Sequence, residues 1–149
     1  MTLEEVKNAF RTIATGHTQI RQFEYGENFD IDKYPNQEDY YPLFFLEIPY
    51  SIQYNFEPSS NKTVSFAIVV LFRTDFDNTH DNHSKISTAE SIADVILQKF
   101  RKDYKTQFKI SSANGLSLSQ YTDDRTAGVR VEITGTVNRE CLNESDFNN

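Results

Sequence analysis

The sequence predicts an α+β fold, in which a mainly antiparallel or mixed β-sheet carries two amphipathic helices on one face of a single domain. Two segments, residues 3–15 and 88–103, repeat apolar residues at helical spacing. The residues between and after them alternate apolar and polar side chains, as strands do. This order of elements is typical of α+β domains. We therefore expect both helices to pack on the same face of one sheet.

The first helix is expected over residues 3–15. Thr2 and Glu5 have the spacing of a capping box, in which each side chain accepts a hydrogen bond from the other residue's backbone amide. The apolar stripe of this helix consists of Leu3, Val6, Phe10 and Ile13. The following residues, 21–42, mix acidic and aromatic side chains and predict a long connection with a short strand near Phe29–Ile31.

The middle of the chain predicts an antiparallel hairpin over residues 51–72. Before it, residues 43–48 are apolar on both faces, which suits a strand covered on both sides, and Pro49 is expected to end that strand. Residues 51–56 alternate apolar and polar side chains up to a Pro-Ser-Ser-Asn turn. Residues 64–72 have large apolar side chains at every even position and give the strongest strand signal in the chain.

The second helix is expected over residues 88–103, after a polar excursion at 73–86. Ser87 and Glu90 form a second possible capping box. The side chains expected to dock this helix on the sheet are Ile92, Ile96 and Phe100.

The last third of the chain predicts short strands at 108–110 and 116–118 and a longer one at 129–137, from their alternating apolar residues. An Asn-Gly pair at 114–115 is expected to separate the two short strands. The domain is expected to cover residues 1–142, with a flexible polar tail at 143–149.

Charge and composition limit the classes of partner. The chain has 22 acidic and 15 basic residues among 149, a net charge of −7, which disfavours sequence-specific nucleic-acid binding and attachment to anionic membranes. A single cysteine, Cys141, excludes an intrachain disulfide. The longest apolar run is too short to span a bilayer, and residues 1–16 lack the pattern of a signal peptide. We therefore expect protein partners.

Potential metal ligands gather in one segment, but their spacing fits no known site. An EF-hand beginning at Asp75 needs Gly at its sixth position and an acidic residue at its twelfth, where this chain has His80 and Ile86. His80 and His83 lack a third ligand at a recognisable spacing. We predict no catalytic residues, no cofactor and no metal, and a metal-dependent hydrolase using these histidines is the least favoured function.

Tyrosines in the long connection are the main candidates for intersubunit contacts. Tyrosine combines a large apolar area with a polar tip, which suits interfaces, although such residues also cover the edges of cores. Both interpretations remain open here. With two acidic residues of the polar excursion, the candidate interface residues are Tyr25, Tyr34, Tyr40, Tyr41, Asp75 and Asp77.

The order and spacing of several segments resemble those of a family of small phage proteins. The segments are Val6–Ala14 with His17 and Ile20, Tyr41–Leu46, Val64–Phe72, the helix at 88–103, Thr126–Ile133 and Asn138–Cys141. Over residues 6–141 the chain is similar to tail-completion or tail-terminator-like proteins of tailed phages that infect Bacteroidetes.

The resemblance implies a non-enzymatic virion protein that forms a homo-oligomeric ring, sixfold or twelvefold, at the head-to-tail neck or the tail end. Its implied partners are other neck, portal-side or tail proteins, and it would be made in the cytoplasm of the bacterial host. In that arrangement we expect residues 21–42 and 73–86 to reach adjacent subunits. The alternative is a monomeric adaptor or ligand-binding module that uses the aromatic connection at 21–42.

Overall fold

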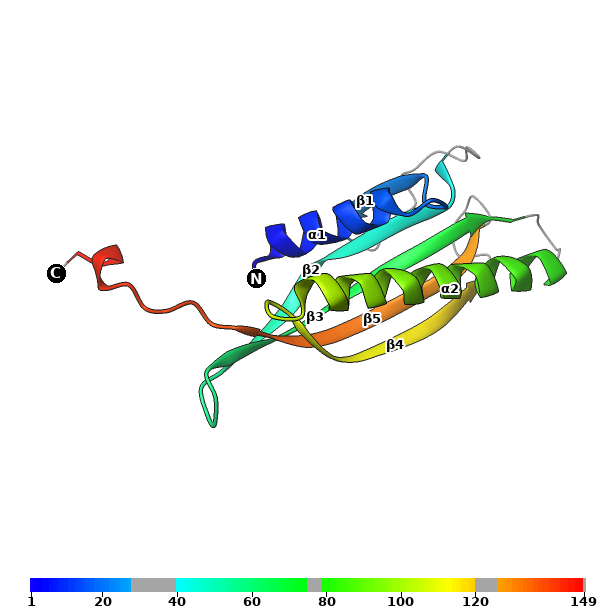
Figure 1. Ribbon diagram of the computed structural model, residues 1–149. Helices are drawn as coiled ribbons and strands as arrows, with labels where there is room; N and C mark the ends of the chain where they lie inside the picture. Colours follow the sequence, from blue (N-terminus) through cyan, green and yellow to red (C-terminus); the bar gives the residue numbers. More distant parts are fainter. Residues whose placement is uncertain (28–39, 75–78, 120–125, 149) are drawn as a thin grey trace.

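The computed structural model describes residues 1–27, 40–74, 79–119 and 126–148 (Figure 1). Within these ranges, five strands form one sheet in the order β1-β2-β3-β5-β4. β1 runs parallel to β2, and all other neighbouring strands are antiparallel. The predicted α+β class with a mixed sheet is therefore confirmed. The elements are α1 (Leu3–Gly16), β1 (Gln22–Gly26), β2 (Leu43–Asn55), β3 (Asn61–Arg73), α2 (Thr79–Tyr104), β4 (Lys109–Ser119), β5 (Thr126–Asn138) and a 3₁₀ turn (Glu144–Asp146).

Both helices pack on one face of the sheet, as the sequence predicts (Figure 1). The aromatic rings of Phe10 on α1 and Phe100 on α2 stack with their centroids 4.5 Å apart. Phe66 of β3 meets Phe10 edge to face, so the three rings join both helices to the central strand. Ile92 and Ile96 are also buried, which confirms the predicted docking face of the second helix.

The start of α1 carries the predicted capping box. The backbone amide of Thr2 donates to Glu5 Oε2 at 2.6 Å, and the amide of Glu5 donates to Thr2 Oγ1 at 3.2 Å. The hydrogen bond from the Thr2 backbone lowers the pKa of the Glu5 carboxyl. A side-chain contact with Lys7 likewise lowers the pKa of Glu4. Both carboxylates are thus held ionised at the positive end of the helix dipole.

The opposite face of the sheet has a smaller core of its own. Its buried members are Tyr41, Leu43, Phe45, Val69, Leu71 and Leu118. Beside this cluster, Arg130 of β5 donates to Glu47 of β2 through Nη2 at 2.8 Å and Nε at 3.1 Å. The ion pair crosses β3, which lies between these strands, and so links three neighbouring strands. The beginning of β2 is covered on both sides, as its apolar sequence predicts.

Pro49 does not end β2, contrary to expectation. The strand continues to Asn55, and its register against β3 shifts between Glu47 and Ser51. A bulge leaves residues without a ladder partner, so it accepts a proline that has no amide hydrogen to donate. The predicted antiparallel hairpin is confirmed as β2 and β3.

The second helix begins at Thr79, nine residues earlier than expected. Its buried stripe continues backwards from Ala89 to Asn82, which is only 4% exposed. Because Asn82 is polar, the stripe is not visible as an apolar pattern, and the segment containing His80 and His83 was wrongly predicted to be a loop. Ser87 lies within the helix and does not begin it.

The two short strands expected near 108–110 and 116–118 are one continuous strand, β4. Gly115 pairs with Val131 inside it and makes no turn. β4 lies at the edge of the sheet and most of its side chains are exposed, so the alternation that marks a half-buried strand is weak. The strand β1 was not predicted, and the strand expected at Phe29–Ile31 lies outside the described residues.

Candidate functional site

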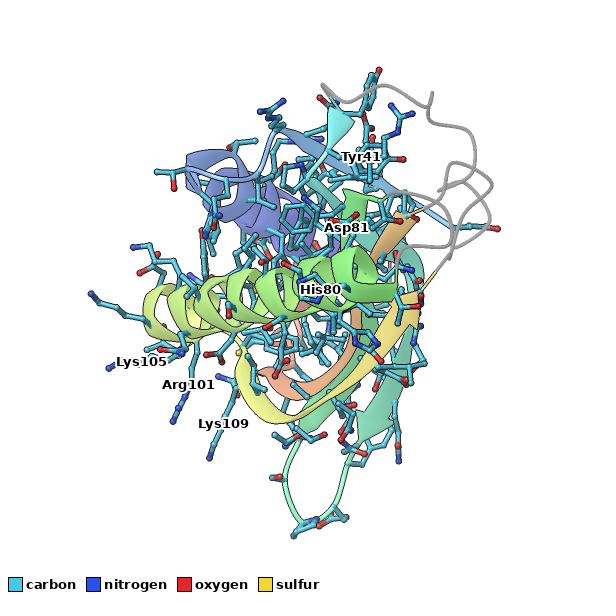
Figure 2. All side chains as sticks on the ribbon, turned by 90° about the vertical axis from the view of Figure 1, so that its right-hand side faces the viewer. Tyr41, His80, Asp81, Arg101, Lys105 and Lys109 are labelled. Carbon is cyan, nitrogen blue, oxygen red and sulfur yellow. The ribbon has the colours of Figure 1, made fainter. Side chains whose placement is uncertain are left out.

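The structure describes three of the candidate interface residues, Tyr25, Tyr40 and Tyr41. Tyr34, Asp75 and Asp77 lie outside the described residues. Tyr41 is 6% exposed and belongs to the smaller core, against which Tyr40 also packs. The burial of Tyr41 favours the interpretation that it covers the core edge. Figure 2 labels Tyr41 near the end of the sheet where β2 begins.

Tyr25 is the most accessible tyrosine of this set within the described part of the chain. It lies on β1 with 40% of its surface exposed. Lys7 Nζ lies 4.6 Å from its ring centroid, and the Arg11 guanidinium carbon lies 5.7 Å away. These cations hold the ring against α1, so part of its surface is already used within the chain.

His80 and His83 lie on the first turns of α2, and both are exposed. Figure 2 labels His80 with Asp81 at this end of the helix. Within the described ranges, no group of three or more His, Cys, Asp or Glu side chains could hold a metal ion.

Replacing His80 and His83 together with Ala is expected to leave the thermal midpoint nearly unchanged. Exposed positions change stability by about 0.5 kcal/mol or less, and Ala is a good helix former. Thermal denaturation of both proteins, followed by circular dichroism, measures this. Stoichiometric zinc, nickel or copper that stays bound through purification without chelators would show that the two histidines hold a metal after all.

The end of the sheet near the β2–β3 turn carries two projecting segments. The first residue of β3, Asn61, pairs with the last residue of β5, Asn138, so the hairpin turn and the C-terminal segment leave the sheet at the same end. Figure 1 shows both extending beyond the ends of the helices. We call residues 51–60 and 139–148 together the projecting end.

Large apolar side chains are exposed on the hairpin part of the projecting end. Ile52, Tyr54 and Phe56 have exposed fractions of 42%, 56% and 67%. Ile52 is directly opposite Val64, a residue of the helix-covered core, so its side chain lies on the helix side of the sheet. These residues alternate as core residues do, but they lie where neither helix covers the sheet.

The C-terminal part of the projecting end also exposes apolar groups. Leu142 and Phe147 are 71% and 59% exposed. The segment expected to be a flexible tail contains the 3₁₀ turn, in which the backbone amide of Ser145 donates to Asn143 Oδ1 at 3.1 Å. At its base, the Arg139 guanidinium carbon lies 4.2 Å from the ring centroid of Phe56. This stacking joins the two parts of the projecting end.

Comparison with profiles of known protein families and with curated protein sequences finds no match. None of the helices in the described ranges is long and apolar enough to cross a membrane. Of the eight large hydrophobic side chains that are exposed in those ranges, five lie on the projecting end. This concentration makes the projecting end the candidate functional site, and its residues were not singled out by the sequence.

Proposed function

We propose that this chain is a structural subunit of a closed homo-oligomeric ring in a tailed-phage virion, at the head-to-tail neck or the tail end. The observation that carries the proposal is the projecting end, where large apolar side chains stand on two segments that extend beyond the helices. Contiguous exposed apolar surface marks sites of protein contact. The closed ring and its place in the virion are the parts of the proposal that rest on the family resemblance.

A contact made by a projecting segment suits ring assembly. In a cyclic oligomer, each subunit uses one surface to bind the next subunit and a different surface to receive the previous one. The hairpin and the C-terminal segment leave from one end of the sheet, so they can reach a neighbour while the helix-covered core stays intact. The same contact is then repeated around the ring.

Replacing Phe56 with Ser is expected to weaken assembly without unfolding the subunit. Phe56 is 67% exposed, so the fold loses little when its ring is removed. An aromatic residue at the centre of an interface contributes about 2 kcal/mol or more, which is more than tenfold in affinity at every contact. Native mass spectrometry and sedimentation of the purified full chain over a concentration series measure the effect.

Leu116→Ser is the matched control. Leu116 is 63% exposed but lies on β4, away from the projecting end. We expect the unchanged chain and this control to form closed oligomers at the same concentration. If both substitutions weaken assembly equally, the loss at Phe56 is not specific, and the projecting end would not be assigned to the interface. A chain that stays monomeric at every concentration would instead support the adaptor alternative.

A further inference from the structure

A basic pocket lies between the end of α2 and the start of β4. It is open to solvent and has a volume of about 930 Å³. Five of its ten lining residues are Lys or Arg, and none is acidic. Figure 2 shows three of them, Arg101, Lys105 and Lys109, pointing outward on the same side of the molecule. One third of the 15 basic residues of an acidic chain thus surround one pocket.

Most of this positive charge is not neutralised by the chain itself. Lys99 Nζ lies 3.1 Å from Asp103 Oδ2. The other four cations have no ion-pair partner within the described residues. Basic residues in the last turn of a helix interact favourably with the negative end of the helix dipole, which accounts for Arg101 and Lys102. The helix dipole does not account for Lys105 and Lys109, which follow the helix. The unpaired cations therefore make the pocket attractive to a negatively charged group.

The pocket also has apolar lining. Val95 is 52% exposed on α2, and the partly buried Ile110 lines the pocket from the start of β4. An occupant that satisfies this pocket therefore carries carboxylates together with apolar side chains. A bare anion would meet only the charged part.

The C-terminal segment of the chain has this chemistry. After Arg139 it contains three acidic residues and no basic one, and it exposes Leu142 and Phe147. We propose that the basic pocket binds residues 140–148 of a neighbouring copy of the chain. This inference rests on the ring proposed above, because each subunit would give its segment to one neighbour and receive a segment from the other.

The length and direction of the segment fit binding to another copy. Figure 1 shows the segment leading away from the sheet and the helices of its own chain. Nine fully extended residues would span at most about 30 Å, and the 3₁₀ turn within the segment shortens this reach. The acidic residues are Glu140, Glu144 and Asp146, spaced along the same stretch as the apolar side chains.

Cys141 allows a direct test in the full chain, since it is the only cysteine, is exposed and lies on the segment. A benzophenone photocrosslinker is attached to Cys141, and chains labelled with ¹⁵N are mixed with unlabelled chains at the concentration at which rings form. We expect mass spectrometry to find crosslinks between Cys141 of one isotope and residues 95–110 of the other.

Charge reversal provides the controls. Arg101→Glu with Lys105→Glu is expected to lower the crosslink yield at least tenfold. Arg21→Glu with Arg73→Glu changes the same number of exposed cations at the opposite end of the sheet and is expected to leave the yield unchanged. A chain with Glu144→Lys and Asp146→Lys is expected to restore crosslinking when its partner carries the reversed pocket.

Three results would overturn the inference. Crosslinks only within one isotope would place the segment on its own chain, and crosslinks outside residues 95–110 would place it on another surface. Short duplex DNA that binds the pocket, in samples that form no crosslinks to residues 95–110, would assign the pocket to phosphates. The mass of the same samples distinguishes failure of this inference from failure of the proposed ring. A closed oligomer with crosslinks outside residues 95–110 would support the ring and contradict the segment contact. A dimer with the expected crosslinks would support the segment contact and contradict the ring.

Discussion

Ile96→Asp is expected to destabilise the subunit by several kcal/mol. Ile96 is 1% exposed on the face of α2 that packs against the sheet. A carboxylate placed there loses most of its hydration among the buried apolar side chains of the core, so its burial is costly. Domains of this size unfold with about 5–15 kcal/mol, and the substitution removes a large part of that stability. Urea denaturation followed by circular dichroism measures the loss.

Val95→Asp is the control for this substitution. Val95 precedes Ile96 on the same helix but is 52% exposed, so an aspartate at this position keeps much of its contact with water. We expect a change of about 0.5 kcal/mol. If Ile96→Asp loses no more free energy of unfolding than Val95→Asp, the docking face assigned to α2 is wrong.

Gly128→Ala is expected to destabilise the sheet by more than the roughly 1–3 kcal/mol typical of overpacked cores. Gly128 lies on β5, paired with Leu71 of β3 on one side and Leu118 of β4 on the other. A Cβ atom there would overlap the carbonyl oxygen of Val70. That oxygen belongs to the backbone of the central strand, so relief of the overlap requires a shift of the sheet. The same urea denaturation measures the effect.

Gly115→Ala tests whether any added methyl group in the sheet has this effect. A Cβ atom at Gly115 would lie 3.7 Å from Val129 Cγ2, an ordinary van der Waals contact. Alanine also reduces the conformational freedom of the unfolded chain, so we expect an unchanged or slightly higher stability. Equal losses at both glycines would contradict the close approach at Gly128.

The elements that the sequence predicts correctly are those in which buried apolar residues recur at one spacing along the whole element. The stripe containing Ile92, Ile96 and Phe100 repeats at helical spacing, and all three residues are buried. The strand at 64–72 and its hairpin partner are equally clear. These are the elements in which apolar side chains alone mark the buried face.

The elements that were missed break this relation between polarity and burial. Asn82 is polar and buried, which hides the first turns of α2. β4 is an edge strand whose side chains are mostly exposed, so it has little alternation to detect. The Glu47–Arg130 ion pair joins residues far apart in the sequence, and its only sequence signal is a Glu within an apolar strand.

The candidate site could not be located from the sequence for a related reason. Ile52, Tyr54 and Phe56 alternate with polar residues as the residues of a covered strand do, and alternation does not show where the covering helices end. Leu142 and Phe147 stand singly in a polar segment. By contrast, the tyrosines of the long connection attracted attention through their number, yet Tyr41 is buried.

Cryo-electron microscopy of the virion to which we propose that this chain belongs tests the ring proposal most directly. We expect the chain in the neck or at the tail end as a closed ring of six or twelve copies, with the projecting end of each subunit against its neighbour. Absence of the chain from neck and tail density, or its presence there as a single copy, would contradict the proposal.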